Sequence, residues 1–126
     1  MQGEAVKILV TDDSKAMRMI VMRHVRQAGF DDAEFCEAGN GLEGLEQVRQ
    51  ENPDLILCDW NMPEMDGHAF LKALRSEGFD TPFGFVTSES TPDMIALARG
   101  SGAMFLIAKP FTVEVFRDTL NAAGVS

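Results

Sequence analysis

The sequence predicts an α/β protein in which helices cover both faces of a parallel sheet. Short apolar runs of strand length alternate with segments of helical apolar periodicity along the 126-residue chain, as a parallel sheet with crossover helices requires. Side chains that can carry chemistry follow four of the five expected strands, at the edge where open parallel sheets bind ligands. The length suits one compact domain spanning residues 1–126.

The first strand is expected over Lys7–Thr11, a short run rich in β-branched residues. Ser14 then caps a helix that continues to about Ala28, and Gly29 ends it. The apolar side of this helix recurs at spacings of three and four and consists of Met17, Ile20, Val21, His24, Val25 and Ala28. This spacing predicts a helix with one face packed on the sheet.

The middle of the chain predicts a weaker strand over residues 32–36, a turn over 39–41 and a second helix. The inner face of that helix is predicted to consist of Leu42, Leu45 and Val48. Pro53 breaks it, because the residue before a proline avoids helical backbone angles. Leu55–Cys58 is a continuous apolar run typical of a buried strand, and a third helix is expected over 67–75.

The last third of the chain predicts two strands and two helices. Residues 83–86 form the fourth strand, in which Gly84 indicates a close backbone approach. Thr91 caps a helix that continues to about residue 99, and residues 104–108 form the fifth strand. A helix opened by Thr112 closes the chain, with an inner face of Val113, Phe116 and Leu120.

Five side chains directly follow the expected strands: Asp12, Asp13, Asp59, Thr87 and Lys109. Taken alone, Asp12 and Asp13 are equally typical of a turn that caps a helix. Their combination with an acid, a hydroxyl and an amine at the same edge favours a built site. Clustered carboxylates raise each other's pKa, and a divalent cation relieves this repulsion. All-oxygen ligands favour magnesium, which also binds phosphate oxygens.

The same constellation suits phosphoryl transfer to Asp59. An ionised carboxylate can attack phosphorus and has no proton to lose, so it needs no general base. Lys109 and the metal would neutralise charge on the transferring oxygens. The hydroxyl of Thr87 could donate one further hydrogen bond.

Composition excludes several other classes. Lys and Arg number 11 against 20 Asp and Glu, a formal charge of −9, whereas direct nucleic-acid binding needs a basic surface. No apolar run approaches the roughly 20 residues of a membrane helix. Residues 1–6 lack the features of a signal peptide, so we expect a cytoplasmic protein. Cys36 and Cys58 show no metal-ligand spacing and are expected to be small packing residues.

At these positions the sequence resembles the receiver domains of two-component response regulators, most closely the single-domain chemotaxis regulators. The resemblance spans essentially the whole chain and rests on residues 8–14, 59–67, 86–89 and 109–112. It implies a flavodoxin-like, doubly wound sheet of five strands in the order 2-1-3-4-5 with five helices. Residues 1–126 would then form one receiver domain.

The resemblance also assigns roles to the matching residues. Asp59 is the expected phosphoacceptor, Lys109 would pair with the phosphoryl group, and Thr87 would reach toward it and report its arrival. The peptide bond between Lys109 and Pro110 is expected to be cis, a form open to X–Pro bonds.

The metal site that the resemblance implies is a magnesium site. Asp13 and Asp59 would bind the ion through their carboxylates, and Asn61 through its backbone carbonyl. Asp12 would act mainly through a coordinated water. Asn61 and Glu89 would also tune self-dephosphorylation, and the less favoured alternative is that both are solvated loop residues.

The implied donor is a phosphohistidine on a sensor histidine kinase or a phosphotransfer protein. The chain would catalyse its own phosphoryl transfer and hydrolysis without being a turnover enzyme. Its downstream protein target would bind the surface from about Thr91 to Ala122. A stand-alone regulator, a phosphorelay shuttle and a fragment of a longer regulator all stay open, as do the cognate kinase and the oligomeric state.

One position departs from the family pattern. Many receivers carry Tyr or Phe three residues before the lysine, and that ring moves inward on activation, whereas this chain has Leu106. Phe105 is adjacent but should face the other side of the strand. The threonine–aromatic switch is therefore predicted to be absent or modified, with activation passing through the loop after Thr87 and the helix that Thr91 caps.

Three other residues have ordinary structural interpretations. His24 is expected to be a half-buried packing residue, and His68 is expected to be exposed. Trp60 is expected to face solvent beside the acceptor, as in the resembling proteins. Cys36 and Cys58 should lie two strand spacings apart, roughly 10 Å, too far for a disulfide.

Two other functions compete with the receiver interpretation. Phosphohydrolases with an aspartate nucleophile usually space two aspartates by one residue after the first strand, whereas Asp12 and Asp13 are adjacent. A binding module that no longer accepts phosphate is the second rival, and Leu106 is the residue that keeps it open. A flavin module is disfavoured because the acidic pocket would repel a flavin phosphate.

Overall fold

The computed structural model describes residues 5–125, and its five parallel strands form one sheet in the order β2-β1-β3-β4-β5. The strands are β1 (Lys7–Thr11), β2 (Glu34–Ala38), β3 (Leu55–Cys58), β4 (Phe83–Thr87) and β5 (Phe105–Ala108). The helices are α1 (Lys15–Gln27), α2 (Gly41–Glu51), α3 (Gly67–Ser76), α4 (Pro92–Gly100) and α5 (Val113–Ala122). The predicted fold class and strand order are confirmed. The expectation about a signal peptide falls largely on residues 1–4, outside the described part.

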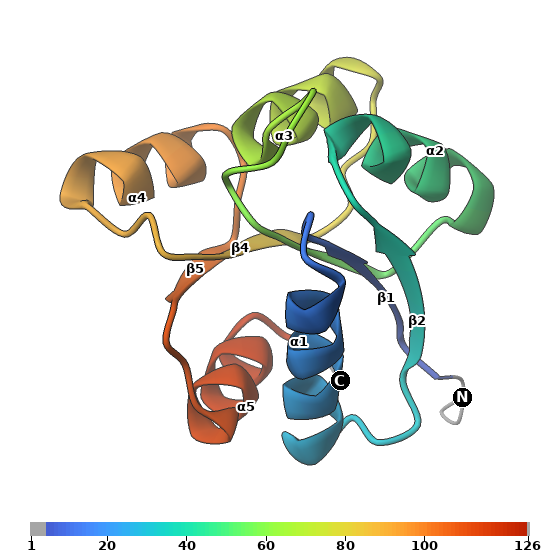
Figure 1. Cartoon of the computed structure of the whole chain (residues 1–126), viewed down its shortest axis with the longest axis vertical. Helices are drawn as coiled ribbons and strands as arrows, with labels where there is room; N and C mark the ends of the chain where they lie inside the picture. Colours follow the sequence, from blue (N-terminus) through green and yellow to red (C-terminus); the bar gives the residue numbers. More distant parts are fainter. Residues whose placement is uncertain (1–4, 126) are drawn as a thin grey trace.

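Helices cover both faces of the sheet (Figure 1). α1 and α5 lie together on one face, and α2, α3 and α4 lie on the other. Alternate residues of a strand point to opposite faces, so Leu55 and Leu57 join the core under α1 and α5, while Ile56 and Cys58 join the core under α2 and α3. All four residues of β3 are buried, which explains its continuous apolar sequence.

Each helix begins at a side chain that accepts a hydrogen bond from a backbone N–H of the first turn. These N-cap residues are Ser14, Asn40, Asp66, Thr91 and Thr112. Such caps typically stabilise a protein by about 1 kcal/mol each. Four of them stand within a few residues after a strand, so capping also fixes the loops at the carboxyl edge of the sheet.

Two predictions were wrong, one about the bounds of a strand and one about the buried face of a helix. β2 covers Glu34–Ala38 rather than residues 32–36, because Glu34 pairs with Lys7 at the start of β1. Leu42 was placed on the inner face of α2, but it is 49% exposed. Gly44 is buried there instead, where a Cβ would lie 2.7 Å from Cζ of Phe70. α2 therefore packs on α3 through a glycine.

The bounds predicted for the remaining elements hold within a residue or two. Ile20, however, was placed on the packed face of the first helix and is 37% exposed. Gly84 does mark a close approach, because a Cβ there would overlap the ring of Phe105 on the neighbouring strand. Cys36 and Cys58 are free and belong to strands on either side of β1. Cys58 is buried as expected, while Cys36 is only half-buried. In the described part of the chain, no helix has the length and apolar character needed to cross a membrane.

Candidate functional site

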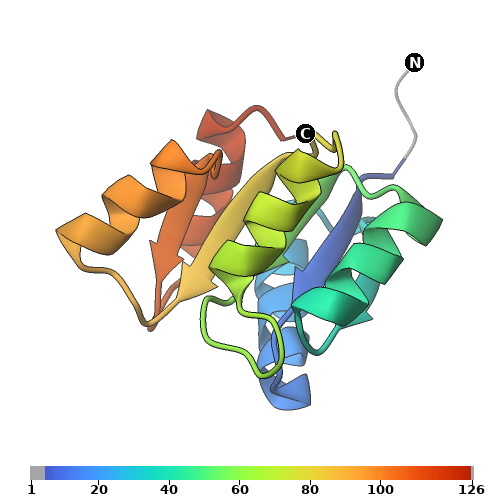
Figure 2. The ribbon, with the colours of Figure 1, turned by 90° about the horizontal axis from the view of Figure 1, so that it is seen from above.

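The strands deliver their last residues to one edge of the sheet (Figure 2). Thr11 of β1 is paired with Cys58 of β3, so Asp12 and Asp59, the residues that follow, emerge side by side. Ala108 of β5 is paired with Thr87 of β4, which brings Lys109 to the same edge. Parallel register thus assembles side chains that are up to 97 positions apart in sequence.

The predicted acidic cluster forms. Asp12, Asp13 and Asp59 each offer a carboxylate oxygen, and these oxygens lie within 4.8 Å of one another. Asp12 is 4% exposed, Asp59 is half-buried, and Asp13 is exposed. A hard divalent cation is bound by such oxygen sets, and Asp13 leaves the cluster open on the solvent side.

Lys109 crosses the site. Its Nζ donates to Oδ2 of Asp12 and to Oδ2 of Asp59, each at 3.2 Å. The Lys109 side chain is 19% exposed, against 6% and 12% for the two carboxylates. Charge-assisted contacts in this partly dehydrated setting hold the ammonium where an incoming anion would meet it. The peptide bond between Lys109 and Pro110 is cis, as predicted.

Burial raises the pKa of the Asp12 carboxyl above its ordinary value, and the nearby charge of Asp59 acts in the same direction. The backbone N–H of Ser14 and the Lys109 ammonium oppose this rise without cancelling it. The carboxylate form is therefore favoured by added positive charge at this edge. This is the electrostatic condition under which a cation binds.

Arg18 supports the same strand end and was not singled out from the sequence. Its guanidinium donates to the backbone carbonyl of Asp12 at 2.7 Å and to Oε1 of Glu37 at 2.8 Å. Glu37 is the penultimate residue of β2. The contact fixes the backbone on which Asp12 stands. Because the Arg18 contact depends on the pairing of β1 with β2, no local sequence motif predicts it.

The loop after Asp59 is tightly constrained. The backbone N–H of Trp60 donates to Oδ1 of Asp59 at 2.7 Å, and Gly67 N donates to the carbonyl of Trp60 at 2.8 Å. A Cβ at Gly67 would overlap the carbonyl oxygen of Asp59. Trp60 was expected to face solvent, but it is 7% exposed. Its ring is covered by the rings of Phe85 and His68.

A hydrogen bond joins the β3–α3 and β4–α4 loops beside the carboxylates. Nδ2 of Asn61 donates to Oε2 of Glu89 at 2.9 Å. The backbone N–H of Glu89 donates to Oγ1 of Thr87 at 3.3 Å, and Thr87 is fully buried. The two positions singled out for tuning are therefore hydrogen-bonded to each other, with Asn61 exposed and Glu89 half-buried.

The two histidines differ in outcome. His24 is half-buried, with its ring edge-on to Phe111 at 4.9 Å between centroids, as predicted. His68 was expected to be exposed, but it is half-buried and bonded to Ser101. Its partner lies 33 residues away, beyond the reach of sequence periodicity. Phe105 and Leu106 do face opposite sides of the sheet.

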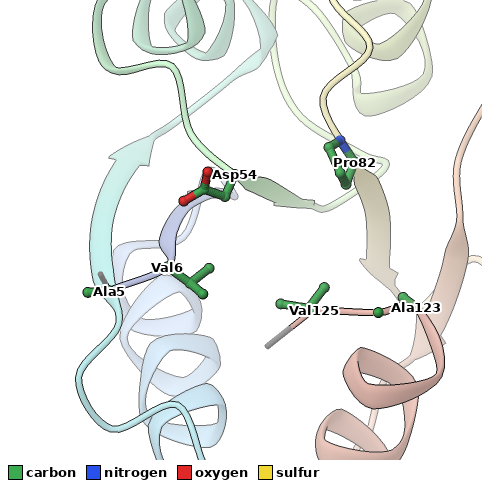
Figure 3. A pocket seen from close by; sticks show the side chains of 7 residues that line it. Ala5, Val6, Asp54, Pro82, Ala123 and Val125 are labelled. Carbon is green, nitrogen blue, oxygen red and sulfur yellow. The ribbon is translucent and has the colours of Figure 1, made fainter. Parts of the chain in front are cut away.

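Two surface hollows lie at opposite edges of the sheet. One of about 490 Å³ adjoins the acidic cluster and is lined by Asp13, Asn61, Met62, Pro63 and Asp66. The other, of about 360 Å³, lies at the opposite edge of the sheet near both ends of the described chain (Figure 3). Among its described lining residues Asp54 alone is charged, and Asp54 already accepts the backbone N–H of Lys7. The chemistry is therefore concentrated at the carboxyl edge.

Fold and site together define a doubly wound α/β domain with an acidic, cation-type pocket crossed by a lysine at the carboxyl edge of its sheet. The response regulator receiver domain model matches residues 8–121. The chain belongs to this family, and it is a receiver domain of the two-component response-regulator type.

Relatives and solved structures agree. A chemotaxis protein CheY homolog of Campylobacter jejuni is 36% identical over 119 residues, covering 92% of this chain and 90% of that protein. A probable chemotaxis protein CheY of Rhizobium etli is 31% identical over 122 residues, covering 95% and 93%. The structure of the Vibrio cholerae chemotaxis protein CheY4 superposes with a TM-score of 0.84 at 32% identity, covering 94% and 98%.

Proposed function

We propose that this protein accepts a phosphoryl group on Asp59 from a phosphohistidine donor and signals through protein contacts that depend on it. The observation that carries the proposal is that Lys109 Nζ donates to both Asp12 and Asp59, at 3.2 Å each, within an acidic cluster. Family membership supports the same reaction.

The cofactor in this proposal is Mg²⁺. Carboxylates of Asp13 and Asp59 and the backbone carbonyl of Asn61 would hold the ion, with Asp12 acting mainly through water. The carboxylate oxygens fit this use, since they lie within 4.8 Å of one another and hard cations prefer oxygen ligands. When bound, magnesium neutralises charge on phosphate oxygens.

In the reaction, a carboxylate oxygen of Asp59 attacks phosphorus, and the bond from phosphorus to the donor imidazole breaks. The departing imidazole takes up a proton from water, and an acyl phosphate forms. Lys109 offsets the charge that Asp59 gains, and the Thr87 hydroxyl turns from Glu89 toward the new group. Water attack later releases inorganic phosphate and restores the carboxylate.

Asn61 and Glu89 are the proposed tuning residues for that hydrolysis, and their 2.9 Å hydrogen bond next to the hollow that adjoins the acidic cluster supports a joint role. The protein itself is phosphorylated and then returns to its starting state by hydrolysis, so the reaction changes the signalling state of the protein. We therefore class it as a self-modifying switch and not as a turnover enzyme. We propose a cytoplasmic location, because a kinase donor would be charged from ATP there.

The donor is a sensor histidine kinase or a phosphotransfer protein, and the downstream partner is a protein that binds the surface between Thr91 and Ala122. Three of the large apolar side chains exposed on the described residues lie on that surface: Leu97, Met104 and Val115, at 48%, 46% and 42%. Binding of a protein partner there would bury these apolar side chains, which favours association. Nucleic acid and membrane are not proposed partners.

The test is intact mass after incubation with magnesium and acetyl phosphate. We expect one added phosphoryl group in the wild type, lost on chelation of magnesium and lost in Asp59→Asn. Asp80→Asn serves as a matched control, because Asp80 is exposed on the loop before β4. A folded wild type that gains no mass would point to a phosphate-independent binding module, the alternative that Leu106 keeps open.

A further inference from the structure

α4 is loosely attached to the domain. Ala98 is its buried residue, and its main contacts are with β5. Two side chains of α3 hold its C-terminal end. Arg75 donates to the carbonyl of Gly102 at 3.0 Å, and Nε2 of His68 is hydrogen-bonded to Oγ of Ser101 at 2.7 Å. These two bonds therefore attach the C-terminal end of α4 to α3.

The bond from His68 leads back to the acceptor. The His68 ring is stacked on Trp60, with centroids 5.3 Å apart and planes 9° from parallel. The Trp60 ring is also stacked on Phe85, with centroids 4.6 Å apart and an angle of 30° between the ring planes. The backbone N–H of Trp60 donates to Oδ1 of Asp59 at 2.7 Å. Contacts therefore run without a gap from the Asp59 carboxylate to Ser101.

Arg75 provides a contrast on the same helix. Its guanidinium also donates to the carbonyls of Phe79 and Thr81, at 2.9 and 3.0 Å. Those acceptors belong to the α3–β4 loop, at the other end of the sheet from Asp59. Arg75 thus anchors α4 to the scaffold, whereas His68 anchors it to the acceptor loop.

We propose that His68 is a positioning residue that couples the state of the Asp59 carboxylate to the C-terminal end of α4, through its stack on Trp60 and its bond to Ser101. The switching part of this inference rests on the proposed phosphorylation of Asp59. A phosphoryl group on Asp59 changes the carboxylate that accepts the Trp60 N–H hydrogen bond. A resulting shift of the Trp60 ring changes the stacking contact that positions His68. Leu106 has no ring that could turn on activation. On the same face of the sheet, the aromatic rings of Phe85, Trp60 and His68 are stacked on one another.

The resting protein tests the coupling without any phosphoryl group. Hydrogen exchange is measured at the amides of residues 101–103, and acrylamide quenching is measured for Trp60, the single tryptophan of the sequence. Ser101→Ala and His68→Phe should each speed exchange about fivefold, the usual effect of one lost hydrogen bond. The double variant should be no faster than either. Fully additive effects would overturn the proposal.

Trp60 then reports transmission in the reverse direction. Ser101→Ala should change Trp60 quenching when His68 is present and leave it unchanged in the His68→Phe background. Arg75→Lys is the matched control, since it should loosen the same amides without altering Trp60. Ser76→Ala, an exposed serine of α3, should alter neither signal. A Trp60 signal that ignores Ser101→Ala in the wild-type background would overturn the role of His68.

The phosphoryl arm uses magnesium with beryllium fluoride as the mimic, and acetyl phosphate for intact mass. The wild type should change its protection at residues 98–103, and His68→Phe should reduce that change at least twofold while still gaining one phosphoryl mass. An equal response in both proteins would overturn the coupling and leave the proposed function standing. A wild type with no mass gain and no response would overturn the proposed function and the switching part, while the resting-state cycle still decides whether His68 joins Trp60 to α4.

Discussion

Asn61, which lines the hollow beside the acidic cluster, is hydrogen-bonded to Glu89 at 2.9 Å. The bond holds a further carboxylate near that hollow in a chain whose formal charge is −9. A small phosphodonor is itself an anion and is repelled by like charge. We therefore expect the charge of Glu89 to slow the approach of such a donor.

The first prediction concerns this charge. Glu89→Gln keeps a carbonyl oxygen that can accept from Asn61 but removes the charge, so phosphorylation by acetyl phosphate should be about two- to threefold faster at low ionic strength. The rate is followed by intact mass against time, and the gain should shrink as salt is added. Asp80→Asn removes an exposed charge elsewhere and should leave the rate alone. A salt-independent change would mean that Glu89 acts through geometry.

The second prediction concerns Gly84. A Cβ at this position would overlap the ring of Phe105, and both residues lie inside the sheet, so Gly84→Ala should destabilise the protein by about 1–3 kcal/mol. Urea unfolding measures the change. Phe105→Leu in the same chain should recover part of it. Gly100→Ala meets open space at the end of α4 and should be neutral or stabilising by up to about 1 kcal/mol.

The third prediction concerns thiol reactivity. Burial raises the pKa of Cys58 well above its ordinary value, with the neighbouring charge of Asp59 adding to the rise. Burial also raises the pKa of the half-buried Cys36, to a smaller degree. Because the thiolate is the reactive form, iodoacetamide at pH 8 should alkylate Cys36 slowly and Cys58 only after unfolding. Peptide mass mapping shows which cysteine reacts, and early alkylation of Cys58 would contradict its burial.

The fourth prediction concerns pH. Two hydrogen bonds link Arg49 of α2 to Glu77 after α3, at 3.1 and 2.6 Å, and the hydrogen-bonded Arg49 guanidinium lowers the pKa of Glu77 from its ordinary value. A lowered carboxyl pKa gives stability that is present above the unfolded-state pKa and is lost as pH falls through the folded-state pKa. Arg49→Gln should therefore lower the urea midpoint at pH 7 and lose this effect below pH 4.5.

Arg117 supplies the comparison for that experiment. Its side chain is 50% exposed, like that of Arg49, but its partner is the adjacent Asp118. Arg117→Gln should leave the pH profile of stability unchanged, because an exposed pair between neighbours contributes little. Identical profiles for the two variants would mean that the Arg49 pair adds nothing either.

The fold was predictable because its signals are local. Leu55–Cys58 is a continuous apolar run, and Ser14 and Thr91 cap the helices where the sequence places them. Asp12, Asp59 and Lys109 were also predictable, because parallel strands bring their ends to one edge whatever the loops between them do. Residue type and position relative to a strand were sufficient.

The failures share a cause, which is tertiary packing without a local signal. Gly44 is buried where Leu42 was expected, because Phe70 of α3 occupies the space that a side chain at residue 44 would need. Trp60 is buried because His68 and Phe85 cover it, and His68 is held by Ser101. In each case the deciding partner belongs to another element of the fold, so periodicity along one segment carries no information about it.

The last prediction concerns Thr11, the final residue of β1. Its hydroxyl is buried and has no hydrogen-bond partner among the described residues. Burying a polar group without a partner is unfavourable, and replacing it with an apolar group of the same shape removes that penalty. Thr11→Val should therefore raise the free energy of unfolding by about 1 kcal/mol, measured by urea unfolding.

Thr87→Val is the matched comparison, because Thr87 is equally buried but its hydroxyl accepts the backbone N–H of Glu89. Losing that bond should lower stability by about 0.5–1.5 kcal/mol, so the same chemical change should have opposite signs at two strand ends of one sheet. If Thr11→Val instead destabilises the protein as much as Thr87→Val does, the Thr11 hydroxyl must have a partner such as an ordered water.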